Sequence, residues 1–124
     1  MVFSVLAKRG AIAALIAVVI NIALYGISVW AGWMDYAVPQ TGEPITLAAI
    51  IVFTVVPILG AVLVYWLLDR FTSRTTRWFL IVAALVFIVM SVPAFQLPGA
   101  PLGLVIILNL MHIAVALPAV LLLV

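Results

Sequence analysis

The chain has 124 residues, of which 70% are hydrophobic and only 6% are charged. A mean hydropathy of +1.56 predicts one integral membrane domain over residues 1–124, because a soluble domain carries far more charged surface. The net charge of +2 comes from five basic and three acidic residues, which form no basic stripe for nucleic acid. The absence of cysteine excludes disulfides, thiolate metal sites and dithiol redox chemistry.

Four apolar runs follow one another along the chain, at about residues 11–33, 45–68, 78–95 and 102–124. Each is about as long as a helix that crosses a ~30 Å hydrocarbon layer. The first run follows two basic residues, as a signal peptide would, but it is too long for one and no convincing A-x-A site comes after it. We therefore expect four retained membrane spans.

The basic residues indicate the orientation of these spans. Lys8 and Arg9 precede the first span, while Arg70, Arg74 and Arg77 lie near or within the connection between the second and third. The other two connections contain no Lys or Arg. Because positive charge stays in the cytoplasm, we expect both termini to be cytoplasmic and the protein to be a multi-pass protein of the plasma membrane.

The connections also predict the fold. They are short, so consecutive spans are expected to be antiparallel neighbours in an all-α, up-down-up-down four-helix bundle. Gly99 and Gly103 form a G-x-x-x-G pattern, which is typical of helix dimers. Pro101 lies between them, so a turn is the preferred interpretation. Pro57, Pro93 and Pro118 fall inside spans, where they can kink helices.

Polar residues are few within the spans, and they gather at one depth. At ~1.5 Å per residue, several lie roughly 16–22 Å from the cytoplasmic end of their span. Unpaired polar groups are costly in hydrocarbon, so we expect these side chains to face the bundle interior. With Tyr25, which lies on one helical stripe with Asn21 and Ser28, the predicted polar layer is Asn21, Tyr25, Thr54, Ser91, Asn109 and His112.

This layer allows three interpretations. The first is purely structural: the polar groups satisfy one another, and the ring of His112 bonds Asn21, Ser91 or Thr54. The second is a small-molecule, proton or haem site centred on His112, with Met90 or the His112 of a second copy as a further haem ligand. The third is contact with another subunit. The cofactor is left unknown, and one histidine without cysteine is too little for a zinc site.

Catalytic groups are missing from the predicted spans. No Asp or Glu lies within them, whereas a proton-coupled transporter of the small multidrug resistance type uses a membrane carboxylate. Asp35 and Asp69 fall at interfaces, so a Ser–His–Asp arrangement is not expected. The sequence thus indicates a protein that is not an enzyme.

Two segments carry a resemblance to a known family. The arginine-bearing connection (Arg70, Arg74, Arg77, Trp78) and the run Leu108-Asn109-Leu110-Met111-His112 resemble an uncharacterised prokaryotic family of four-span membrane proteins with a domain of unknown function. The resemblance covers most of the chain. It implies four spans and draws attention to Met111 and His112, but it implies no activity.

Three functions remain open at this stage. The leading hypothesis is an accessory or assembly subunit of a membrane complex, or a homo-oligomer. The alternatives are a small-ligand carrier or channel, and a haem- or quinone-binding protein. The expected partners are membrane lipids and another membrane protein or a second copy, but not nucleic acid.

Overall fold

A computed structural model describes residues 2–39 and 42–124 as an all-α bundle. Its long helices are α1 (Phe3–Trp30), α2 (Leu47–Phe71), α3 (Thr75–Phe95) and α4 (Leu102–Leu123), and a short 3-10 helix, η1 (Trp33–Asp35), follows α1. All four long helices are apolar and long enough to span a membrane. The predicted four-helix fold is confirmed.

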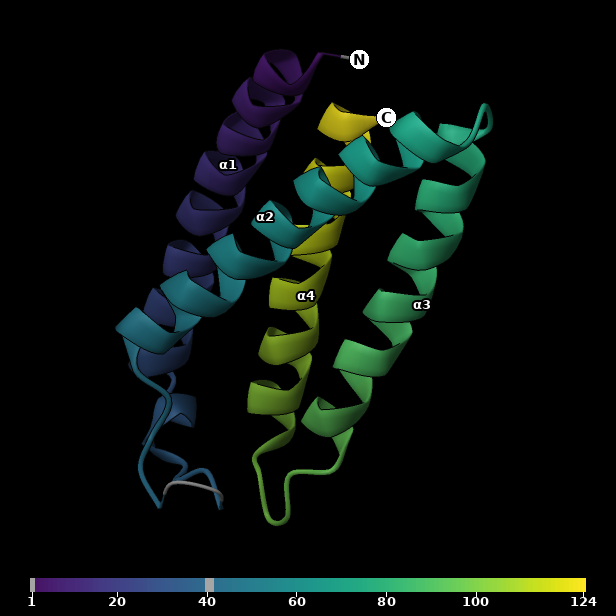
Figure 1. Ribbon diagram of the computed structural model, residues 1–124. Coiled ribbons are helices and arrows are strands. Elements are labelled where there is room, and N and C mark those ends of the chain that lie inside the picture. The colour runs from purple at the N-terminus through teal and green to yellow at the C-terminus, as the bar shows by residue number, and fades with distance from the viewer. Residues whose placement is uncertain (1, 40–41) are drawn as a thin grey trace.

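The helices run up and down between two ends of the molecule. The two termini and the connection between α2 and α3 lie together at one end, which we call the terminal end (Figure 1). The connections from α1 to α2 and from α3 to α4 lie at the other end, the loop end (Figure 1). This agrees with the predicted topology, while the cytoplasmic position of the terminal end stays a prediction.

The first helix extends further than the predicted span. α1 has 28 residues and so measures roughly 42 Å at ~1.5 Å per residue, more than the hydrocarbon layer needs. It begins at Phe3, so Lys8 and Arg9 lie within its first turns rather than before it. Both are exposed, and the helix can carry them beyond the apolar layer.

The bundle is not symmetric. α1 packs mainly against α4 and α2, whereas α3 contacts α4 and α2 but not α1 among the described residues. Figure 1 shows α2 crossing the bundle diagonally in front of α1 and α4, with α3 standing on the outside of α4. α3 is the least buried of the four spans.

Small residues bring α1 close to its neighbours. Gly10, Ala13 and Ala17 are all buried along one stripe of α1. A Cβ added at Gly10 would strike the side chain of Val62 in α2, while Ala13 and Ala17 pack with Ile58 of α2 and Ala119 of α4. This is the usual mode of helix packing in membranes, where small side chains allow backbones to approach.

Specific contacts hold the loop end together. A Cβ on Gly103 would strike the ring of Trp33, so this glycine lets η1 pack directly on α4. Gly103 therefore serves packing within the chain. The hydroxyl of Tyr36 donates to the carbonyl of Pro98 at 2.7 Å and so joins the two loop-end connections.

Candidate functional site: a cleft between α2, α3 and α4

A cleft of about 520 Å³ lies toward the loop end of the bundle. Its walls come from the first half of α2, the last turns of α3 and the middle of α4, and the segment before α2 covers part of it. Most lining side chains are apolar; the lining set is Asn21, Val38, Glu43, Pro44, Ile45, Thr46, Ala49, Ile50, Phe53, Thr54, Met90, Pro93, Leu97, Leu108, Met111, His112 and Val115. A cavity of this size, mostly apolar with a few polar groups, is typical of small-molecule sites.

Two helices supply a buried polar pair to this cleft. The side-chain amide of Asn21 in α1 donates through Nδ2 to Oγ1 of Thr54 in α2 at 2.8 Å. The Thr54 hydroxyl donates in turn to the carbonyl of Ile50, one turn earlier in α2, at 2.6 Å. Both side chains are only 2% exposed, so the pair lies away from lipid and fixes the register of α1 against α2.

Two of the side chains that line the cleft each contain a buried polar atom without a hydrogen-bond partner in the described part of the chain. Oδ1 of Asn21 and Nδ1 of His112 are both buried and have no partner within residues 2–39 and 42–124. Leaving such an atom unpaired costs about 1–3 kcal/mol. Because Asn21 and His112 both line the cleft, it contains unused hydrogen-bonding capacity from α1 and from α4.

The other predicted polar residues lie elsewhere. The hydroxyl of Ser91 donates to the carbonyl of Phe87 at 2.8 Å, and Nδ2 of Asn109 donates to the carbonyl of Val105 at 2.8 Å. Each thus bonds its own helix one turn back, as Ser28 also does. Within the described residues, the expected mutual satisfaction of the layer therefore occurs only between Asn21 and Thr54. His112 shows no hydrogen bond to Asn21, Ser91 or Thr54 there.

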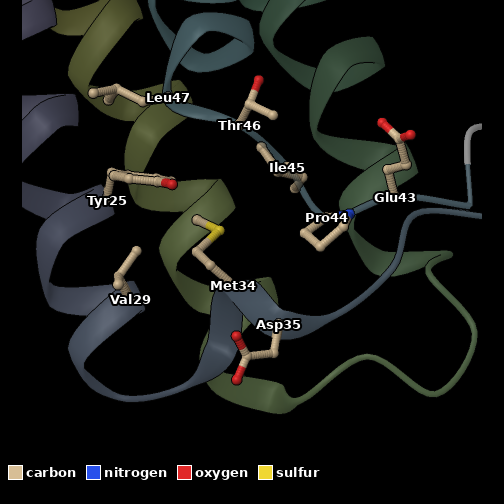
Figure 2. A pocket seen from close by; sticks show the side chains of 9 residues that line it. All are labelled: Tyr25, Val29, Met34, Asp35, Glu43, Pro44, Ile45, Thr46 and Leu47. Atoms are coloured by element: carbon tan, nitrogen blue, oxygen red, sulfur yellow. The ribbon is translucent and has the colours of Figure 1, made fainter.

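Tyr25 lines a second pocket of about 400 Å³ beside the cleft. Figure 2 shows its ring extending from α1 toward the segment that precedes α2. Asp35 and Glu43 stand at separate ends of this pocket with their carboxylates pointing apart (Figure 2). They are not arranged as the paired carboxylates that general acid–base catalysis uses in glycosidases.

The cleft does not suit haem. His112 and Met90, the two ligands considered from the sequence, do both line it. However, its lining residues include Glu43 and no lysine or arginine, so the two carboxylates of a haem would have no cationic partner there and would meet an acidic side chain. Among the described residues, no three histidine, cysteine or acidic side chains are grouped to hold a metal ion.

Sequence reasoning missed most of the cleft walls. Val38, Glu43 and Pro44 belong to a connection for which the sequence predicts only a short link between spans, and Phe53 is one of many apolar residues of the second span. A signal was present in the repeating small residues Gly10, Ala13 and Ala17, which continue along α1 to Asn21. That stripe marks the face of α1 turned toward its neighbours.

No curated protein and no solved structure is found to match the chain. A family model does match, over residues 2–124, and its description is "Family of unknown function (DUF6069)". This agrees with the resemblance drawn from the arginine-bearing connection and the Met111-His112 run. With its four apolar helices of membrane-spanning length, the chain is an integral membrane protein that belongs to the DUF6069 family.

Proposed function

We propose that the protein binds a small lipophilic molecule in the cleft between α2, α3 and α4, as a carrier or binding protein rather than an enzyme. The observation that carries this proposal is the coincidence of an apolar cavity of about 520 Å³ with two lining side chains, Asn21 and His112, that each contain a buried polar atom without a partner among the described residues. Apolar walls accept the body of such a molecule, and the few polar groups orient it.

Adjacent alanines offer a matched test. Ala49 lines the cleft, whereas Ala48, the preceding residue, is exposed and does not line it. Ala49→Phe should fill part of the cavity, while Ala48→Phe adds the same side chain on the lipid-facing side. The probe is 4-nonylphenol with a diazirine in its alkyl chain, added to the purified protein in lipid nanodiscs and crosslinked by light.

We expect crosslinks to Phe53, Met90 or Met111 in the wild type and in Ala48→Phe, and their loss in Ala49→Phe. Peptide mass spectrometry locates the modified residues. Equal labelling of all three proteins, spread over lipid-facing positions, would mean that the probe dissolves only in the bilayer, and the proposal would then be abandoned.

The second candidate is an accessory or assembly subunit, or a homo-oligomer, and the exposure of α3 favours it. This helix contacts only α2 and α4 within the described chain, and Leu85, Ile88 and Val89 on it are all more than half exposed. A partner helix could pack along this face. Native mass spectrometry from mild detergent tests it: a stable monomer with no co-purifying membrane protein would contradict this candidate.

We further propose that the terminal end faces the cytoplasm of a plasma-membrane protein. The support is the positive charge of this end and the absence of Lys and Arg from the loop-end connections. In intact cells, a membrane-impermeant thiol reagent should label Ala37→Cys at the loop end but not Ser73→Cys at the terminal end. The reverse pattern would invert the orientation.

A further inference from the structure

We infer that the cleft selects molecules whose head group is a neutral hydroxyl, of the phenol or hydroquinone type, with Asn21 and His112 as the recognising side chains. This inference rests on the proposed function and specifies the chemistry of its ligand. It follows from the direction of the hydrogen bonds at the cleft.

The Thr54 hydroxyl fixes the orientation of the Asn21 amide. A hydroxyl has one proton, and that of Thr54 goes to the carbonyl of Ile50 at 2.6 Å. Oγ1 of Thr54 must therefore accept at its 2.8 Å contact with Asn21, and only the NH₂ group of the amide can donate to it. The amide oxygen is the atom left without a partner among the described residues. Because Oδ1 only accepts, the ligand must supply a donor.

His112 further restricts which head groups can bind. Its Nδ1 is buried without a partner within the described chain, and in a neutral imidazole this atom is either a donor or an acceptor, according to the tautomer. A hydroxyl that donates its one proton to Oδ1 of Asn21 can still accept a hydrogen bond, and it suits the His112 tautomer that carries its proton on Nδ1. An ether or a ketone cannot donate to Asn21, and an ammonium cannot accept from a protonated Nδ1.

The remaining lining residues exclude anionic head groups. No lysine or arginine lines the cleft, and its one charged lining residue is Glu43. A phosphate or carboxylate would thus be desolvated without a cation to pair with it. Phe53, Met90 and Met111 from three different helices offer apolar and polarisable walls, which suit an aromatic ring with an alkyl tail.

A matched pair of probes tests this chemistry. 4-Nonylphenol and its methyl ether, 4-nonylanisole, share ring and tail and differ in the hydroxyl proton. Each is made with the same diazirine in the tail, and their competition for cleft labelling in nanodiscs gives relative affinities. We expect the wild type to prefer the phenol on the order of tenfold, as for one hydrogen bond to a buried acceptor.

Substitutions then test whether Asn21 and His112 are the residues that recognise the hydroxyl. Asn21→Leu and His112→Leu should each reduce the preference for the phenol, whereas His112→Gln, which keeps a donor and an acceptor, should retain most of it. Asn109→Leu is the control, because Asn109 bonds its own helix and does not line the cleft. Thermal unfolding of each variant shows whether it is folded, and the wild-type comparison is decisive even if Asn21→Leu does not fold.

The outcomes separate the two proposals. If both probes label the cleft equally and Ala49→Phe blocks both, the hydroxyl inference is overturned while the cleft remains a ligand site; water would then satisfy Asn21 and His112. If neither probe labels the cleft, the proposed function fails as well. A preference for the phenol that persists in both leucine variants would overturn the assignment to Asn21 and His112.

Discussion

Thr54→Val isolates the side-chain hydrogen bond between Asn21 of α1 and Thr54 of α2. Valine has nearly the shape of threonine, so packing is preserved while the hydroxyl is lost. Nδ2 of Asn21, which donates to that hydroxyl at 2.8 Å, is then left without its partner in a side chain only 2% exposed. The carbonyl of Ile50 is less affected, since it still accepts the backbone N–H of Thr54 within α2.

The expected loss of stability in Thr54→Val lies between a larger and a smaller energy. Burying an unpaired amide donor costs about 1–3 kcal/mol, whereas hydrogen bonds between membrane helices contribute on average only ~0.6 kcal/mol, and up to ~1.7 kcal/mol. The Asn21–Thr54 pair is among the most buried polar groups of the chain, so the contribution of its hydrogen bond should lie near the upper end of the range for membrane helices. We expect Thr54→Val to lower the free energy of unfolding by about 1–2 kcal/mol.

The assay is reversible unfolding in mixed micelles, in which SDS is titrated against a mild detergent and helix content is followed by circular dichroism. Thr54→Ser loses the methyl group but retains the hydroxyl, so it should keep the bond to Asn21. Ser91→Ala removes a hydroxyl that bonds only its own helix and should cost less. A Thr54→Val protein as stable as the wild type would refute the inferred geometry, as would equal losses for Thr54→Val and Ser91→Ala.

Two further predictions concern the loop end. Gly103→Ala should destabilise the protein by about 1–3 kcal/mol, because the added methyl group strikes the ring of Trp33; Gly60→Ala, where nothing lies within 4 Å, should be neutral or stabilising by up to ~1 kcal/mol. The same micelle titration measures both, and equal effects would contradict the close packing of η1 on α4. Tyr36→Phe should cost about 0.5–1.5 kcal/mol through loss of the 2.7 Å bond to the carbonyl of Pro98, and an unchanged titration midpoint would argue against that bond.

The number of spans and their alternation could be predicted because they depend on composition over some 20 residues at a time. A helix in hydrocarbon must be apolar along its whole length, and the charged connections of this chain interrupt the pattern clearly. Helix ends were less predictable: α1 begins at Phe3, well before the apolar run, because an exposed helical turn can also carry Lys8 and Arg9. Hydropathy predicts which residues lie in the membrane, but it does not predict the residue at which a helix begins.

Asn21, Thr54 and His112 line one cleft, as expected for residues at similar heights in their helices, but the rotation of each helix about its axis could not be predicted. Asn109 and His112 are three residues apart and are both predicted to face the bundle interior, yet only His112 lines the cleft. At 100° per residue, Leu108, Met111, His112 and Val115 fall within one sector of α4, and Asn109 lies about 60° beyond its edge. In an almost uniformly apolar helix, the sequence offers no polar side to indicate which sector faces the interior.

The small residues of α1 help to determine where the cleft lies. Gly10, Ala13 and Ala17 draw α1 tightly against α2 and α4, whereas α3 packs through fewer contacts and stays at the periphery. α2 and α3 lie close together at the terminal end, where a short connection joins them. Toward the loop end they diverge, because α2 crosses α1 diagonally (Figure 1). The diverging helices α2 and α3, with α4 behind them, enclose the cleft toward the loop end. Filling it from the α3 side would need larger side chains on the last turns of that helix, so the site depends on helix crossing as much as on Asn21 and His112.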